Sequence, residues 1–285
     1  MPRLPSRLPS RLLGALALLL FAALPGLAAA QEAPALRLYA LDCGHAEFED
    51  FAAASDTGAY DGRAAQLADP CFLIRHPKGW LLWDAGLPPQ LPAALAGTPG
   101  FRVWHERGLA EQLAAIGVRP EQVGYMAFSH LHFDHVGNAA LFDHATWILQ
   151  RAEVDWAERS PAPVSMLPEL FAGYRKAAVR WIDGDADVFG DGTVRILKAP
   201  GHTPGSSVLL LRLPHQGAVL LSGDLYLTLE GRLERHVPAV NADRAATLAS
   251  MQRVEQIAQR LHARLVIQHA PEDFERLPRP PAYLD

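Results

Sequence analysis

Four short polar segments, each following an apolar run, limit what this 285-residue chain can fold into. The first is His130-Leu131-His132-Phe133-Asp134-His135, which follows the apolar residues 125–128. The others are Gly201-His202-Thr203-Pro204-Gly205, Ser222-Gly223-Asp224 and Gln268-His269. Ligands bind at the carboxyl ends of strands in open α/β sheets. The pattern therefore predicts an α/β fold that brings these four segments to one edge.

The rest of the chain alternates between short apolar runs and helical patterns. Strands are predicted at residues 36–41, 71–75, 80–83, 125–128, 147–149, 194–197, 208–213, 218–221 and 265–267. Helices are predicted at residues 104–116, within 151–178 with a break at 160–163, and at 243–262. The polar, acidic residues 44–70 are predicted to form a long loop. No linker interrupts this alternation, so residues 31–285 are expected to form a single domain.

The first polar segment has the residue types and the spacing of a metal site. Residues two apart in an extended chain point the same way, so His130 and His132 can aim two imidazoles at one cation. A turn would then bring Asp134 and His135 to a second point nearby. Neutral imidazole and carboxylate are ligands that suit zinc. Manganese, cobalt and iron also accept nitrogen and oxygen ligands.

The later segments complete two ligand sets. His202 would be the third imidazole on the first cation, His269 would bind the second, and Asp224 has two oxygens with which to bridge them. Two divalent cations carry four positive charges, against three negative ones from Asp134, Asp224 and a bridging hydroxide. A structural zinc has four ligands, mostly Cys, whereas seven candidates are present here. We therefore expect two divalent cations, with zinc as the expected metal, rather than a structural zinc or buried core histidines.

The N-terminus has the three parts of a secretory signal peptide. Three arginines lie within the first eleven residues, an uninterrupted apolar run covers residues 12–24, and Ala28-Ala29-Ala30 offers a cleavage site. The apolar run is shorter than the ~20 residues that a comfortable bilayer span needs. We expect residues 1–30 to be removed on export, without stable membrane insertion, and the protein to be periplasmic or extracellular. An uncleaved anchor is the alternative.

Charge and cysteine content bear on the partners and on the compartment. Loss of residues 1–30 removes three arginines and no acidic residue, so the formal net charge goes from −5 to −5 − 3 = −8. A chain with this net charge has no overall positive potential to attract nucleic acid, so we expect no nucleic-acid partner. Cys43 and Cys71 lie on strands predicted to be neighbours. Export would let them pair, but two separate buried thiols fit the sequence equally well.

The polar segments also resemble those of a known family. His130–His135 resembles the signature of the metallo-β-lactamase superfamily, and the Gly201 and Ser222 segments follow in that superfamily's order and approximate spacing. Trp83-Asp84-Ala85-Gly86 resembles its early strand-end motif. The resemblance covers residues 36–275 and implies a four-layer αβ/βα sandwich, in which two facing mixed sheets have helices outside and a dinuclear site at one edge. Asp84 would then orient a loop or a metal-bound histidine rather than bind metal itself.

Within the superfamily, the chain most resembles the quorum-quenching N-acyl-homoserine lactonases. The resemblance is carried by Leu41-Asp42-Cys43-Gly44, the hairpin over residues 71–79, residues 132–138 and Gly223-Asp224-Leu225-Tyr226. It implies that a metal-bridging hydroxide opens a lactone ring, with Asp134 carrying the proton to the leaving oxygen. Tyr226 is a candidate donor to the developing oxyanion. The alternative for Tyr226 is ordinary packing at a strand end.

An uncharged lactone substrate with an acyl chain requires a binding pocket with an apolar wall, rather than basic residues that bind an anion. The candidates for that wall are Phe48, Phe51, Met166, Leu170 and Phe171, although core packing is the more common role of such residues. Other functions remain open on the same site, namely a glyoxalase II-like thioesterase, a general esterase or lactonase, and a non-catalytic zinc-binding protein. A homodimer is compatible with a domain of this kind.

Overall fold

Twelve strands form two sheets in the part of the chain that the computed structural model describes, which is residues 1–2, 35–91 and 97–285. The chain divides into Met1–Glu32 and a compact unit, Ala33–Asp285, which holds both sheets. The predicted signal peptide, residues 1–30, lies outside the described residues apart from Met1 and Pro2. Among the described residues, none of the helices combines the length and the apolar character needed to cross a bilayer.

The larger sheet has the strand order β4-β1-β2-β3-β5-β6-β7. Its strands are β1 (Arg37–Phe48), β2 (Ala65–His76), β3 (Gly79–Trp83), β4 (Phe101–Trp104), β5 (Val123–Ala127), β6 (Thr146–Gln150) and β7 (Ala178–Ile182). The first four strands in this order pair antiparallel, and β3, β5, β6 and β7 run parallel. The sheet is therefore mixed, and β5 delivers the first polar segment to the carboxyl edge of its parallel half.

The smaller sheet has the order β12-β11-β10-β9-β8. Its strands are β8 (Ala186–Asp187), β9 (Val194–Lys198), β10 (Ser207–Leu213), β11 (Gly217–Leu221) and β12 (Arg264–Val266). Strand β10 pairs antiparallel with both β9 and β11, and β12 pairs parallel with β11. Strands β9, β11 and β12 therefore run in the same direction. Their carboxyl ends, where the other three polar segments begin, share one edge.

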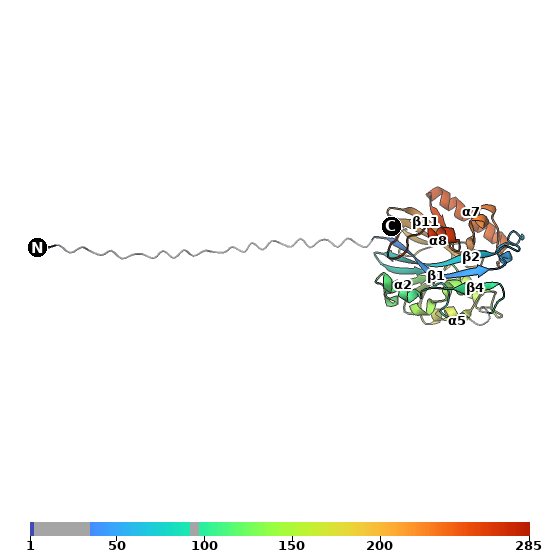
Figure 1. Cartoon of the computed structure of the whole chain (residues 1–285), viewed down its shortest axis with the longest axis horizontal. Coiled ribbons are helices and arrows are strands. Elements are labelled where there is room, and N and C mark those ends of the chain that lie inside the picture. Colours follow the sequence, from blue (N-terminus) through green and yellow to red (C-terminus); the bar gives the residue numbers. More distant parts are fainter. Residues whose placement is uncertain (3–34, 92–96) are drawn as a thin grey trace. The chain divides into compact units, whose positions relative to one another are not determined.

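Helices lie on the outer side of each sheet (Figure 1). The α-helices are α2 (Leu109–Ala115), α3 (Phe133–Val136), α4 (Arg151–Ala157), α5 (Pro168–Phe171), α6 (Leu229–Glu234), α7 (Arg244–Leu261) and α8 (Pro271–Glu275). Short 3₁₀ turns occur at η1 (Ala52–Ala54), η2 (Pro120–Gln122), η3 (Ala139–Phe142), η4 (Ala172–Arg175) and η5 (Gly223–Leu225). Helix α7 begins where the Asp243 carboxylate accepts a hydrogen bond from the amide of Ala246 at 2.9 Å, as a helix N-cap does.

Alternating side chains divide the core into layers. In β2, Cys71 and Leu73 pack toward α2, whereas Phe72 and Ile74 pack against the smaller sheet. A third cluster lies between the smaller sheet and α7. The order is thus helices, sheet, sheet, helix. The four-layer sandwich implied by the resemblance is confirmed.

Three predictions of local structure were wrong. Residues 44–70 are not one loop, because β1 continues to Phe48 and β2 starts at Ala65, with only the middle irregular. Trp104 ends strand β4, so the helix begins later than predicted, at Leu109. The segment 151–178 holds only two short helices and a 3₁₀ turn, and strand β7 after it was missed. In β1, β2, β4 and β7, pairing with a neighbouring strand overrides the local sequence pattern, and a single sequence does not reveal such pairing.

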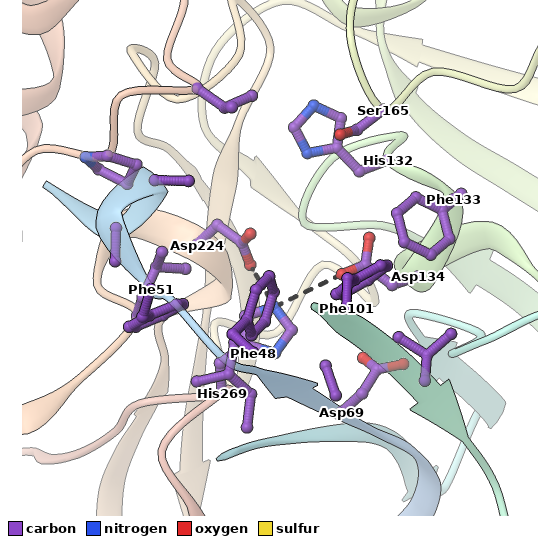
Figure 2. A pocket seen from close by; sticks show the side chains of 18 of the residues that line it. Phe48, Phe51, Asp69, Phe101, His132, Phe133, Asp134, Ser165, Asp224 and His269 are labelled. Carbon is purple, nitrogen blue, oxygen red and sulfur yellow. Dashed lines mark ion pairs between the residues drawn. The ribbon is translucent and has the colours of Figure 1, made fainter. Parts of the chain in front are cut away.

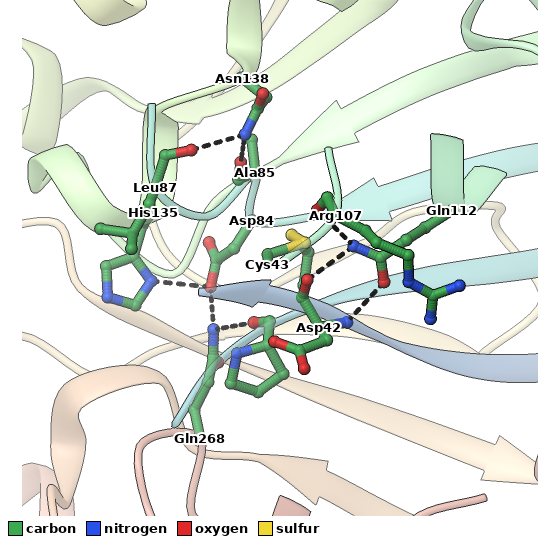
Figure 3. Close-up of a disulfide and its surroundings, with 12 residues drawn as sticks. Asp42, Cys43, Asp84, Ala85, Leu87, Arg107, Gln112, His135, Asn138 and Gln268 are labelled. Atoms are coloured by element: carbon green, nitrogen blue, oxygen red, sulfur yellow. Dashed lines mark hydrogen bonds and ion pairs between the residues drawn. A yellow bond between two sulfur atoms is a disulfide. The ribbon is translucent and has the colours of Figure 1, made fainter. Parts of the chain in front are cut away.

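The pairing of Cys43 with Cys71, which the sequence left open, is settled by the structure (Figure 3). The two Cα atoms are 5.6 Å apart, within the range that a disulfide requires. The register of β1 against β2 shifts between Asp42 and His45, next to the disulfide. There the amide of Asp42 donates to Gln112 Oε1 at 2.8 Å, and Gln112 Nε2 donates to the Asp42 carbonyl at 2.6 Å. The irregular pairing is therefore compensated by a side chain of α2.

We predict that the Cys43→Ala/Cys71→Ala double variant is less stable than the oxidised protein. The bond closes a loop with a sequence separation of 28 residues, for which a loss of about 2–4 kcal/mol in the free energy of unfolding is expected. Urea unfolding followed by tryptophan fluorescence measures the loss. Reductant should shift the midpoint of the parent and leave that of the variant unchanged. An equal midpoint for both oxidised proteins would contradict the prediction.

Candidate metal centre

The seven predicted metal ligands come together between the two sheets. His130, His132, Asp134 and His135 lie in and just before α3, in the segment that follows β5 of the larger sheet. His202 follows β9, Asp224 lies in η5 after β11, and His269 follows β12, all in the smaller sheet. Each sheet thus supplies one part of the cluster. The strand-end interpretation of the sequence explains why residues up to 135 positions apart, Asp134 and His269, meet.

Four residues form the first set. His130 Nε2 lies 2.9 Å from His132 Nδ1, which in turn lies 3.1 Å from His202 Nε2. Asp224 Oδ2 is 3.6 Å from His130 Nε2 and 3.3 Å from His202 Nε2. Ring nitrogens and a carboxylate oxygen thus face a common point, and these four residues are buried.

The second set shares Asp224. Its other oxygen, Oδ1, is 3.1 Å from His135 Nε2 and 3.0 Å from His269 Nε2. Asp134 Oδ2 lies 3.9 Å from each of these two ring nitrogens. Figure 2 shows Asp134, Asp224 and His269 pointing toward one another. The two oxygens of Asp224 therefore face different sets, which is the arrangement of a bridging carboxylate.

These distances fit metal ligands better than a hydrogen-bonded cluster. Two ligands of a tetrahedral zinc ion, each about 2.0–2.1 Å from the metal, lie about 3.3 Å apart. The N–N and N–O separations of the first set range from 2.9 to 3.6 Å. One shared proton can join two facing ring nitrogens, but it cannot also serve a third nitrogen and a carboxylate. The geometry provides two positions that could each hold a divalent cation.

The pKa values of the clustered histidines and of Asp224 also favour cation binding at this site. Burial lowers the pKa of His130, His132 and His202, so these rings are neutral and keep the lone pairs that metal binding needs. Burial also acts against a charge on His269, but the facing Asp224 carboxylate outweighs it and raises the pKa of His269 to about 9. Burial acts to raise the pKa of Asp224, but the imidazoles of His269, His135 and His130 outweigh it and hold that pKa well below its usual range. Asp224 is therefore an anion that requires cationic neighbours.

Asp84 orients a candidate ligand, as the sequence predicted. Its Oδ2 lies 3.1 Å from His135 Nδ1 and accepts a hydrogen bond from Gln268 Nε2 at 2.7 Å, while Oδ1 accepts from the Ser129 amide at 2.6 Å (Figure 3). Asp84 holds a φ of 60°, which is uncommon for a residue with a side chain. Because its carboxylate contacts Nδ1 of His135, the ring presents Nε2 to the metal position.

Glu153 of α4 holds the two metal-binding loops together. This buried carboxylate accepts hydrogen bonds from the Leu131 amide at 3.0 Å, the Thr203 hydroxyl at 2.6 Å and the Gly205 amide at 2.8 Å. Burial raises the pKa of Glu153, and the hydrogen bond from Thr203 opposes that effect. One side chain therefore fixes the loop that carries His130 and His132 relative to the loop that carries His202.

The cluster borders a cavity of about 410 Å³ (Figure 2). His132, Asp134, His202, Asp224 and His269 contribute to its lining, and much of the remaining wall is apolar. That apolar wall includes Phe48, Phe51, Leu67, Phe101 and Phe133. Among the described lining residues there is no Lys or Arg. The cavity therefore suits a ligand that combines a polar reacting group with an apolar body.

Comparison with known families assigns the chain. A profile described as the Metallo-beta-lactamase superfamily matches residues 67–269. The chain belongs to this superfamily. The matched region contains all seven candidate ligands, and it begins close to the start of β2 and ends at His269.

Several similar proteins are named as N-acyl homoserine lactonases. The chain is 32% identical to an N-acyl homoserine lactonase AttM from Azorhizobium caulinodans over 88% of this chain and 99% of that protein. It is 30% identical to an AttM from Agrobacterium fabrum over 87% and 98%. A solved N-acyl homoserine lactone hydrolase, with N-hexanoyl-L-homoserine at its metal centre, matches with a TM-score of 0.76 at 24% identity, covering 87% of this chain and 99% of that one. This last similarity bears on the fold, and it agrees with the sandwich described above.

The role predicted for Tyr226 was wrong. Its side chain is 2% exposed and is not among the residues that line the cavity. The hydroxyl donates to Glu255 Oε1 of α7 at 3.1 Å, and Arg232 Nε donates to the same oxygen at 2.7 Å. Burial and the neighbouring Glu255 raise the pKa of Tyr226 far above its usual range. Tyr226 packs in the cluster between the smaller sheet and α7, whereas the next residue, Leu227, lines the cavity.

Part of the predicted apolar wall was also misplaced. Phe48 and Phe51 line the cavity as predicted, but Met166, Leu170 and Phe171 do not. Met166 and Phe171 are buried in the core beside the larger sheet, where Leu170 packs against them. Phe101 and Asp69 also line the cavity, and neither was predicted to do so from the sequence. Asp69 was overlooked because residues 44–70 were predicted to form a loop. Its position next to the apolar run 71–74 could have marked it as a candidate site residue.

We predict that Tyr226→Phe changes kcat/KM toward a lactone substrate by less than about twofold, because the phenol is directed at Glu255 and not at the metal positions. The loss of one partly buried hydrogen bond should instead lower the free energy of unfolding by about 0.5–1.5 kcal/mol. Steady-state kinetics and urea unfolding on the same preparation separate the two effects. A fall in kcat of a hundredfold with unchanged stability would restore Tyr226 to the catalytic site.

Proposed function

We propose that this chain is a dinuclear metal-dependent hydrolase that opens the lactone ring of N-acyl homoserine lactones. The observation that carries the proposal is the position of Asp224, whose two oxygens face two separate ligand sets beside an apolar cavity. The names of relatives that are 30–32% identical over nearly their full length support the same substrate. A quorum-quenching role follows from that chemistry.

We infer that the two cations are zinc. The proposed ligands are five imidazoles and two carboxylates, a nitrogen-rich set that zinc favours over magnesium or calcium. When bound, a pair of such cations lowers the pKa of water toward neutrality and polarises an ester carbonyl. His130, His132, His202 and Asp224 would hold the first cation, and Asp134, His135, His269 and Asp224 the second.

Asp134 is the proposed acid–base group. Its side chain is 24% exposed, whereas those of His135, His269 and Asp224 are at most 7% exposed, so it is the ligand most accessible from the cavity. Its carboxylate would accept the proton of the attacking water and pass it to the leaving ring oxygen. The water oxygen bonds to the ring carbonyl carbon, the C–O bond of the ring breaks and the leaving oxygen becomes the homoserine hydroxyl. The new carboxylic acid then loses the second proton of the water to solvent and becomes a carboxylate. Tyr226 has no part in this scheme.

The apolar wall is the proposed site for the acyl chain. Phe48 and Phe101 face each other from paired strands with ring centroids 4.8 Å apart, and Phe51 is 5.0 Å from Phe48. Burial of a methylene is worth about 0.8 kcal/mol, so such a wall favours longer chains over shorter ones. A glutathione thioester is anionic and would require basic residues, which the described lining lacks.

The decisive assay offers the zinc-loaded protein an acyl-homoserine lactone, a glutathione thioester and a β-lactam. Carboxylate release is followed by pH-stat titration. We expect lactone opening to be fastest, to stop on removal of metal by a chelator and to return with added zinc. Asp134→Asn should lower kcat by about 10²–10⁴-fold through the loss of proton transfer.

Asp155→Asn is the matched control for the same chemical change on the exposed face of α4, and it should retain full activity. Thioester hydrolysis faster than lactone opening would favour the thioesterase alternative. No turnover of any of the three substrates would leave a zinc-binding protein.

We also propose that the mature protein is exported to the periplasm or beyond the cell. The arginine-rich start, the apolar run and the Ala28-Ala29-Ala30 segment support export, and the Cys43–Cys71 disulfide suits an oxidising compartment. Expression of the full chain in a Gram-negative host should yield periplasmic protein that begins at Gln31. A chain that starts at Gln31 from its own initiator is the control and should remain in the cytoplasm. Retention of residues 1–30 on membrane-bound protein would support an uncleaved anchor instead.

A further inference from the structure

Asp69 is a buried carboxylate that none of the roles above uses. It lies in β2, two positions before Cys71, and is 4% exposed. It lines the cavity beside His269 and Asp134, and Figure 2 shows its side chain directed toward that end of the site. Nothing in the sequence pattern of the ligand segments includes it.

Neither oxygen of Asp69 has a hydrogen-bond partner among the described residues. Leaving a carboxylate buried without partners is costly, and it is normally avoided by an ion pair or by a metal. The described lining of the cavity offers no Lys or Arg to form such a pair. Burial raises the pKa of Asp69 well above its usual range, and the negative charge of Asp134 adds to that effect. A cation bound at this end of the cavity would supply the compensation that the charged form of Asp69 requires.

The geometry identifies where that cation would be. One oxygen of Asp69 and one ring nitrogen each of His135 and His269 all lie within 4.8 Å of one another. These two imidazoles belong to the second ligand set, which Asp224 Oδ1 and Asp134 complete. Asp69 therefore faces the second metal position.

The backbone of β2 fixes Asp69 relative to that position. The carbonyl of Ala68 lies 2.7 Å from His269 Nδ1, and the Ala68 amide donates to the His269 carbonyl at 3.1 Å. The residue that orients His269 thus directly precedes Asp69 in the chain. Gly44 leaves the space that the carboxylate occupies, because a Cβ there would lie 3.1 Å from Asp69 Oδ2. The strand register holds the carboxylate at the site without any hydrogen bond to its oxygens.

We propose that Asp69 is a further carboxylate of the second metal position, where it joins Asp134 and Asp224 in holding and charge-balancing the cation. Two divalent cations bring four positive charges, and Asp134 and Asp224 leave two of these uncompensated. Asp69 reduces the excess to one. The inference rests on the proposed metal centre but not on the proposed lactone substrate.

The test is metal binding by the Asp69→Asn variant, which keeps the shape of the side chain and removes its charge. Zinc is titrated into metal-free protein against a chromophoric chelator, and native mass spectrometry counts the bound ions. For the parent we expect two ions. For Asp69→Asn we expect the first to bind as in the parent and the second to bind at least about tenfold more weakly, the smallest effect common for residues that support a metal site.

Unfolding of the metal-free proteins separates metal binding from folding. Without metal, Asp69→Asn should be as stable as the parent or more stable, because it loses an uncompensated buried charge. With saturating zinc, the gain in unfolding temperature should be smaller for Asp69→Asn than for the parent. Asp155→Asn on α4 should match the parent in both titrations and both unfolding curves.

Two outcomes would overturn the inference while leaving the proposed metal centre intact. One is equal affinity of the parent and Asp69→Asn for the second ion. The other is an equal loss of stability of Asp69→Asn with and without zinc, which would assign Asp69 to folding alone. A parent protein that binds fewer than two ions would instead contradict the proposed dinuclear centre itself.

Discussion

The carboxylate of Asp224 is the interaction on which the arrangement of the site depends. It is buried, and its two oxygens contact imidazoles that come from both sheets. A buried anion in this place is stable only while cationic groups surround it on both sides. The imidazoles around Asp224 come from the segments after β5, β9 and β12, so its charge holds these segments beside its own, which follows β11. This explains why polar side chains gather at an edge where two apolar sheets meet.

Two buried carboxylates next to the candidate ligands, those of Asp84 and Glu153, accept hydrogen bonds from the segments that carry the ligands. Asp84 receives hydrogen bonds from the Ser129 amide and from Gln268, so it joins the segment after β5 to the segment after β12. Glu153 joins the loop of His130 to the loop of His202. Both carboxylates are buried, and neither is a candidate metal ligand or a residue that lines the cavity. Ligand geometry is thus set by a second layer of hydrogen bonds that ties the two sheets together.

The sequence predicted the ligand cluster well and its surroundings less well, for identifiable reasons. His130, His202, Asp224 and His269 follow apolar runs, and strand ends of like direction meet at one edge, so local pattern was sufficient. The direction of the Tyr226 side chain depends on Glu255 and Arg232 of other elements, which spacing from Asp224 does not encode. Asp69 lies inside β2, in the part whose polar residues led to the prediction of a loop. Contacts made across the sandwich were the ones that could not be predicted.

A site assembled from two sheets also links metal binding to the stability of the sandwich. A ligand that binds the folded chain and not the unfolded one stabilises the fold by mass action. Here the linkage has a definite location, because each proposed cation would be held by residues after β5 and by residues after strands of the smaller sheet. Separation of the two sheets would divide both ligand sets at once. Cations at this edge would therefore stabilise the interface between the sheets, while Cys43–Cys71 stabilises the larger sheet alone.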